Sequence, residues 1–424
     1  MLLLTLVGLL LANYDFVIQP LYAYEGLLPL GIGSDFFILA PIWIFLTAGF
    51  IPPSIRRPSD FFLFFYNITC VVWGAVLWGS TGLLSFNGAL LLMVVLLIPN
   101  IFFLPLRTPL AGFASTYFPP VQLAKARRNT VPLLLLVALG GLLAYLAIGN
   151  GSFNWQQIYD RRLEARDALA GGAFATLAGY AMNTATNGAV PMVAFIAGFR
   201  RSLLLFLIAV AYMLELYWLI GQKSGFIYLI TLSCIGFMLP IGAFWKRFVP
   251  LSFVAAIAIY GTSLLMFFRT GSTALADYFV RRISTVQPEI QSYYIDLFSS
   301  ASWHEVLFGV GKGHYSDVTY LVGDRYLHNP ASNADVNAFV YSLVSRGLIG
   351  YAVAIFIITL IYAVLDSFAE KTGRSEFFGL GALFALLIAE QAYTTVLLSS
   401  GTAICLVLLM LFSYPSARHV AMNS

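Results

Sequence analysis

Long apolar runs alternate with short polar stretches along the whole chain. A helix that crosses a membrane needs about 20 apolar residues, whereas barrel strands are shorter and alternate between apolar and polar positions. The unbroken runs therefore predict an all-α, polytopic membrane protein with one helical domain over residues 1–424. Transmembrane helices are expected at residues 1–22, 35–52, 60–79, 86–106, 131–148, 172–198, 202–220, 226–244, 249–268, 336–365, 377–395 and 400–414.

Two of these twelve predicted helices are unusually long. Proline removes a backbone donor and its ring crowds the preceding turn, so Pro191 is expected to kink the helix at 172–198. The helix at 336–365 is long enough to extend beyond the bilayer.

Composition supports a membrane protein. The chain is 60% hydrophobic and 10% charged, whereas soluble domains carry about 25% charged residues. The net charge of +4 is small and does not indicate a nucleic-acid partner. Cys70, Cys234 and Cys405 lie inside apolar runs, so no disulfide is expected.

Lysine and arginine predict the orientation. With both termini inside, thirteen of these residues fall on the inner side, and four fall in the short outer loops. The excess of positive charge marks the cytoplasmic side. Segments 149–171 and 269–332 are therefore expected on the outer side, and 269–332 is the one large extramembrane segment.

Basic residues on the outer side are the first candidates for chemistry. Lys223 lies in a tight turn, and Arg281 and Arg282 follow the predicted helix at 249–268. Guanidinium groups bind phosphate oxygens in a bidentate fork, and lysine adds a point charge. Together they are suited to hold a diphosphate. The alternative is that they bind lipid headgroups or cap helix ends.

A histidine and several acids form a second set of candidates. His328 directly precedes a predicted helix and could take a proton near neutral pH, although a lone histidine is more often structural. Asp335, Ser342 and Arg346 have the spacing of one helical face. That face would line a polar cavity, or Asp335 would pair with Arg346. Glu215 and Glu390 lie inside predicted helices and are fallback bases or helix-packing contacts.

Several catalytic motifs are missing from the sequence. It contains no D-x-D, no H-E-x-x-H, no G-x-S-x-G and no phosphate loop. Their absence disfavours metal-dependent transfer from nucleotide sugars, serine hydrolysis and ATP-driven pumping. We therefore expect no cofactor and no metal.

Three short motifs follow one another in the second half of the chain: Gly309-Val-Gly-Lys-Gly, Leu327-His328-Asn329 and Ser345-Arg346-Gly347-Leu348-Ile349-Gly350. In this order they resemble the C-terminal signature of the bacterial O-antigen polymerase and ligase superfamily. Gly221-Gln222-Lys223-Ser224 resembles the family's basic turn. Arg281-Arg282, Pro288, Tyr293-Tyr294 and Phe298 resemble the polymerase branch. The resemblance covers roughly residues 220–365.

The resemblance implies a metal-independent, inverting membrane glycosyltransferase, similar in architecture to the multi-helix GT-C-like enzymes. It would act on undecaprenyl-diphosphate-linked glycans at the periplasmic face of the bacterial inner membrane. Membrane lipid and a chain-length regulator protein are the other implied partners. Lys223 stands where the ligase branch usually has arginine, which favours a polymerase. The alternatives are a ligase that transfers the glycan to lipid A-core, and a transporter of lipid-linked oligosaccharides.

The implied catalytic residues are Lys223 with Arg281 or Arg282, which would hold the donor diphosphate, and His328, which would orient or deprotonate the acceptor. The further residues expected to bind substrate are Asn329, Arg346, Asp335, Tyr293, Tyr294, Arg161, Arg162 and Arg166.

Overall fold

A computed structural model describes residues 1–117, 130–149, 151–153, 158–169, 171–222, 224–241 and 244–411. These residues form helices without a strand. The first half holds α1 (Leu2–Asn13), η1 (Tyr14–Ile18), α2 (Gln19–Tyr22), η2 (Ala23–Glu25), α3 (Ser34–Ala48), α4 (Pro58–Tyr66), η3 (Asn67–Val72), α5 (Trp73–Leu77), α6 (Phe86–Tyr117), α7 (Thr130–Ile148), α8 (Ile158–Leu169), α9 (Gly172–Thr184), η4 (Ala185–Ala189) and α10 (Val190–Arg200).

The second half begins after the left-handed turn at Arg201. It holds α11 (Leu203–Ile220), α12 (Ser224–Met238), α13 (Phe244–Thr270), η5 (Ala276–Thr285), α14 (Val286–Ser299), α15 (Trp303–Phe308), α16 (Val318–Leu327), α17 (Ala338–Thr372), α18 (Glu376–Ile388), α19 (Tyr393–Leu398) and α20 (Thr402–Leu411).

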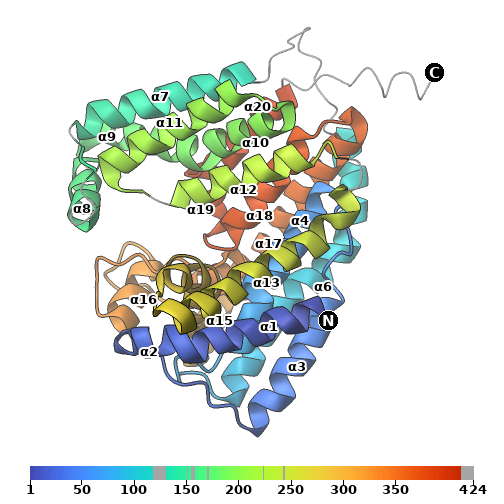
Figure 1. Cartoon of the computed structure of the whole chain (residues 1–424), viewed down its shortest axis with the longest axis vertical. Helices are drawn as coiled ribbons and strands as arrows, with labels where there is room; N and C mark the ends of the chain where they lie inside the picture. Colours follow the sequence, from blue (N-terminus) through green and yellow to red (C-terminus); the bar gives the residue numbers. More distant parts are fainter. Residues whose placement is uncertain are drawn as a thin grey trace.

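The helices form two groups (Figure 1). One group contains α7, α9 to α12 and α20, and the other contains α1, α3, α6 and α13. The helices α17 and α18 lie between the groups: α17 packs on α6, and α18 packs on α10, α12 and α17. Cavities can therefore form where the two groups meet.

Seven helices among the described residues are long and apolar enough to cross a membrane. They span Leu2–Glu25, Pro58–Leu77, Phe86–Tyr117, Thr130–Ile148, Leu203–Ile220, Trp245–Thr270 and Ala338–Thr372. The expected all-helical class is confirmed, with the long apolar helices of a membrane-embedded protein. The other five predicted helices are present but are shorter or, at 172–200, more polar. The number of spans and their orientation stay predictions.

Two predicted helices are interrupted in the structure. The helix predicted at 336–365 is broken at Gly347, whose backbone is non-helical at φ 65° and ψ −165°. The helix predicted at 377–395 ends at Ile388, and a new helix begins at Tyr393. In the sixth predicted helix, a wider π-helical turn, η4, directly precedes α10 and Pro191. The kink expected at Pro191 stays a prediction.

Polar side chains inside the helices pair with one another. Asn67 and Asn100 exchange two amide hydrogen bonds, of 3.0 and 2.8 Å, between η3 and α6. Asn13 of α1 donates to the Tyr260 carbonyl oxygen of α13 at 3.0 Å. Since apolar side chains give helices little specificity in lipid, such bonds help to fix which helices pack together.

The predicted outer segment 269–332 is largely helical. It contains η5, α14, α15 and α16, and α14 is buried against α5, α6 and α17. The hydroxyl of Tyr294 in α14 donates to the carbonyl oxygen of Ala334 at 3.0 Å. Because Ala334 precedes α17, this bond fixes the connection that carries Asp335.

Candidate functional site

A cavity of about 450 Å³ lies between the first helix group and the segments around α16, α17 and α19. We call it the Asp335 cavity. Thirteen of its fourteen lining residues have polar side chains, and none is lysine or arginine. Five of them are amides, contributed by widely separated segments: Asn183, Asn187, Gln222, Asn333 and Gln391. Ligand cavities are usually mostly apolar, so this lining indicates a polar ligand.

Two carboxylates of the Asp335 cavity are held by defined hydrogen bonds. Asp317 caps α16 by accepting the backbone N–H of Thr319 at 3.0 Å, and it also accepts the Tyr341 hydroxyl of α17 at 2.7 Å. Asp335 accepts the side-chain amide of Asn333 at 2.9 Å. Asp317 thus joins two helices, whereas Asp335 lines the cavity with one hydrogen-bond partner among the described residues.

The carboxyl group of Asp335 has a pKa well above its usual range. Burial raises its pKa to about 7, and the negative charges of Asp317 and Glu390 act in the same direction. The bond from Asn333 opposes the shift. A carboxyl group with a pKa near neutrality can accept and release a proton at physiological pH, as general bases do.

The structure changes the expected relation between Asp335 and Arg346. Asp335 precedes α17, which begins at Ala338 with Asn337 as its cap, so the helical-face argument is wrong for Asp335. No ion pair joins Asp335 to Arg346 in the described part of the chain. Arg346 instead donates to the Tyr393 hydroxyl at 3.5 Å.

A second cavity of about 310 Å³, the Tyr293 cavity, is lined by His328, Tyr293, Arg325 and Tyr326 among others. The rings of Tyr293 and Tyr326 stack with centroids 4.9 Å apart. The Tyr293 hydroxyl donates to Glu289 at 2.8 Å, and burial raises the pKa of Glu289 to about 7. The α16 helix lies between the two cavities, because Asp317 at its start faces one and Tyr326 near its end faces the other.

His328 terminates α16 in the left-handed conformation, with φ 52° and ψ 32°. The next backbone N–H, of Asn329, bonds to the Gly323 carbonyl oxygen at 3.1 Å, which closes the helix end. The Asn329 side chain accepts the backbone N–H of Ala331 at 3.0 Å. Both residues therefore have a structural role, and the exposed His328 also faces the Tyr293 cavity.

Arg281 is already paired with acidic groups. Its guanidinium lies 2.9 Å from Glu25 and 3.2 Å from Asp277, and it stacks over the ring of Tyr22 at 4.0 Å. Glu25 lines the Tyr293 cavity, so this ion-pair cluster adjoins it. An anionic ligand would compete with two carboxylates for Arg281. The neighbouring Arg282 is exposed, and it makes no ion pair with any described residue.

Three further predicted cations, Arg161, Arg162 and Arg166, lie on α8. Arg161 donates to the Trp218 carbonyl oxygen at 2.9 Å and Arg162 to that of Gly221 at 3.1 Å, so both cap the end of α11. Arg166 reaches the Ala331 carbonyl oxygen at 3.5 Å. Lys223 lies outside the described residues.

The two acids predicted as fallback bases, Glu215 and Glu390, have different surroundings. Glu390 accepts a hydrogen bond from the Tyr228 hydroxyl at 2.8 Å, and its negative charge helps to raise the pKa of Asp335. Glu215 packs against Gly141 of α7, where an added Cβ atom would lie 2.8 Å from its carboxylate. Glu390 thus belongs to the surroundings of the Asp335 cavity, and Glu215 lines neither cavity.

Sequence reasoning missed most of the Asp335 cavity. Asp317 could have been noticed as an acid directly before an apolar helix, the position of a helix cap. Asn183 and Asn187 are amides four residues apart inside a predicted membrane helix, which places them on one face. Nothing in the sequence indicates that these three residues line one cavity.

No group of three or more histidine, cysteine, aspartate and glutamate side chains in the described ranges is arranged to hold a metal ion. Comparison with protein-family models, with curated proteins and with solved structures finds no match.

Proposed function

We propose that the protein is a polysaccharide polymerase that joins undecaprenyl-diphosphate-linked repeat units at the periplasmic face of the bacterial inner membrane. The observation that supports this proposal is the lining of the Asp335 cavity. A sugar needs donors and acceptors at many hydroxyl groups, and amides supply both. An apolar ligand would make no hydrogen bonds with this polar lining, and a phosphate would be repelled by the carboxylates of Asp317 and Asp335. The acceptor sugar is thus the ligand that fits.

In the proposed reaction, Asp335 accepts the proton of the attacking acceptor hydroxyl. That oxygen forms a bond to the anomeric carbon of the donor, with inversion. The bond from this carbon to the diphosphate oxygen breaks, and the diphosphate leaves with both electrons. Cations stabilise its developing charge. Arg346 is suited to this role because it donates to Tyr393, which directly follows Ala392 of the cavity lining. Lys223 is a second candidate, because it directly follows Gln222 in the sequence.

The test is the reaction itself, with the reconstituted protein and a purified lipid-linked repeat unit. A ladder of products is expected. Asp335→Asn keeps the shape of the side chain but removes its basicity, so turnover should fall about 10²-fold or more. Asp324→Asn is the matched control. It makes the same change of charge, but Asp324 lies on α16 and lines neither cavity.

The pH dependence gives a second readout. Below about pH 7 Asp335 is protonated and cannot accept a proton, so the rate should fall about tenfold per unit as the pH decreases. Above pH 7 it should level off. The residual rate of Asp335→Asn should lack this slope. An unchanged rate and slope in this variant would exclude Asp335 as the base.

Broken helices support a second candidate, a transporter of lipid-linked oligosaccharides. Transporters often place their substrate sites where membrane helices are interrupted. Here the break between α18 and α19 contains Gln391, which lines the Asp335 cavity, beside Glu390. Movement of the lipid-linked glycan across proteoliposomes without a new glycosidic bond would favour the transporter. A single transfer to lipid A-core would identify the ligase.

A further inference from the structure

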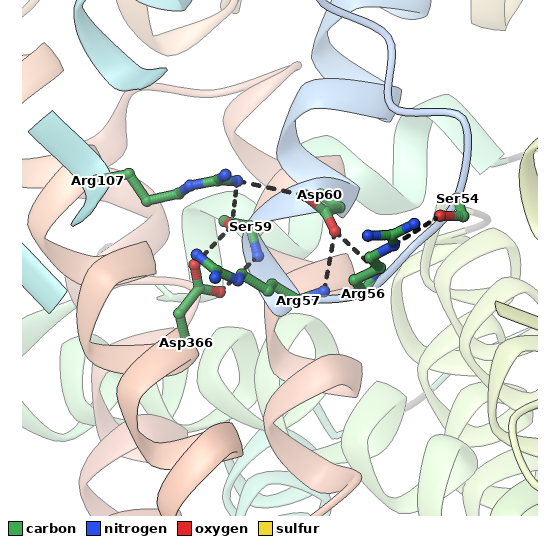
Figure 2. A network of polar contacts seen from close by, with 7 residues as sticks. All are labelled: Ser54, Arg56, Arg57, Ser59, Asp60, Arg107 and Asp366. Carbon is green, nitrogen blue, oxygen red and sulfur yellow. Dashed lines mark hydrogen bonds and ion pairs between the residues drawn. The ribbon is translucent and has the colours of Figure 1, made fainter. Parts of the chain in front are cut away.

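The start of α4 carries a polar network that is separate from both cavities (Figure 2). Asp366 of α17 accepts the backbone N–H of Ser59 at 2.9 Å and its hydroxyl at 2.6 Å. Arg107 of α6 donates to the Ser59 hydroxyl at 3.0 Å and to Asp60 at 3.3 Å. These bonds join α4, α6 and α17 at one end of the helices.

The network leaves two guanidinium groups at its edge. Asp60 accepts the backbone N–H groups of Arg56 and Arg57 at 2.7 and 2.9 Å, so the helix start is occupied by protein carboxylates. The side chain of Arg56 donates to Ser54 at 3.3 Å. Both arginines are exposed, and neither forms an ion pair with a described carboxylate.

These arginines line a cavity of about 240 Å³, the Arg56 cavity, together with Asp366 and Glu370. Asp366 is buried and bonded to Ser59, whereas Glu370, one turn further along α17, is exposed. The cavity therefore presents two accessible cations and one accessible carboxylate. This pattern is complementary to a ligand that has both a phosphate and an amine.

An apolar cavity adjoins the charged one. It has a volume of about 580 Å³ and shares Arg56, Ala369 and Phe378 with the Arg56 cavity. Phe199, Leu239 and Trp245 complete its apolar wall, and the Trp245 ring packs on Phe378 with centroids 4.5 Å apart. The charged Arg56 cavity is thus contiguous with the apolar cavity.

We propose that the two cavities bind one phospholipid whose headgroup carries a primary ammonium. Arg56 and Arg57 hold the phosphate, Glu370 accepts hydrogen bonds from the ammonium, and an acyl chain occupies the apolar cavity. The location of the Arg56 cavity at helix ends agrees with a lipid headgroup as its ligand. The Arg56 cavity lies at the start of Pro58–Leu77 and near the end of Ala338–Thr372, two helices long enough to cross a membrane, and headgroups lie at the ends of such helices.

The ligand class follows from what each alternative would leave unpaired. A soluble phosphate would leave the apolar cavity exposed to water. A fatty acid would leave Glu370 without a partner, and a headgroup with a quaternary ammonium cannot donate a hydrogen bond to it. A lipid with a phosphate, a primary amine and a chain satisfies all three parts.

The experiment counts lipid molecules retained by the purified full-length protein, by native mass spectrometry, after titration with lipids of identical chains. Phosphatidylethanolamine should bind at least fivefold more tightly than phosphatidylcholine or phosphatidylglycerol. Arg56→Gln combined with Arg57→Gln should abolish tight binding. Lys246→Gln combined with Arg247→Gln is the matched control, since both are exposed neighbours of Trp245 that line neither cavity.

Glu370→Gln tests the amine contact separately, because it should remove the preference for phosphatidylethanolamine while phosphatidylcholine still binds. Equal binding of these two lipids to the unmodified protein would overturn the proposal. It would equally be overturned by stronger binding of phosphatidylglycerol, or by an equal loss in the control pair. Competition by chain-free phosphoethanolamine with the same affinity as the lipid would show that the apolar cavity contributes nothing.

Discussion

Two glycines of the family-like motifs interlock at the break in α17, and substituting either should destabilise the fold. Gly309 follows α15 with φ 101° and ψ 157°, and Gly347 has φ 65° and ψ −165°. Residues other than glycine are essentially excluded from this region of φ and ψ. The backbone N–H of Val310 bonds to the Val344 carbonyl oxygen at 2.7 Å, so the two segments are in direct contact.

The structure sets the magnitude of the loss. A Cβ atom on Gly347 would lie 2.2 Å from the carbonyl carbon of Leu307, and one on Gly309 would lie 2.3 Å from the Ser345 oxygen. Backbone strain in this region costs about 1–3 kcal/mol, and forcing an atom into a packed site costs about 1–3 kcal/mol more. Alanine at either position should therefore lower the free energy of unfolding by about 2–6 kcal/mol.

Denaturant unfolding in detergent, followed by tryptophan fluorescence, measures this loss. Gly311→Ala is the control from the same motif, because Gly311 has no atom within 4 Å of its added Cβ and no positive φ. The double variant should lose less than the sum of the two single losses, since both break the same contact. If Gly347→Ala unfolds at the same denaturant concentration as Gly311→Ala, the interlock is refuted.

Two further predictions concern His328 and the orientation of the chain. Glycine accepts the left-handed backbone, so His328→Gly should keep the stability within about 1 kcal/mol; it should also retain the pH dependence assigned to Asp335, and a lost slope would return the role of base to His328. For the orientation, in a variant whose native cysteines are replaced, an impermeant thiol reagent should label Ser316→Cys but not Ser54→Cys in intact spheroplasts, since the inner side carries the excess of lysine and arginine. The reverse labelling pattern would invert the proposed topology.

The helices were predictable because their cause is local. A long apolar run in lipid must satisfy its own backbone hydrogen bonds, and a helix does this within one segment. The two breaks were not predictable, because Gly347 lies in an apolar run that fits an unbroken helix equally well. Only the contact with Leu307, 40 residues earlier, gives that glycine its conformation.

The candidate site could not be predicted in the way that the helices were, because its residues come from distant segments of the chain. Asn183 of α9, Asp317 ahead of α16 and Gln391 between α18 and α19 meet only when these distant helices pack together, so no local pattern could place them in one cavity. The short motifs were visible because they are local, and the structure gives several of their residues a supporting role. Gly309 and Gly347 lock α15 to α17, and Asn329 helps to close the end of α16. These same helices carry Asp317 and Tyr341, which are bonded to each other in the cavity wall. The motifs therefore stabilise the helices that line the Asp335 cavity. The proposed base, Asp335, lies between two of these motifs in the sequence and belongs to neither.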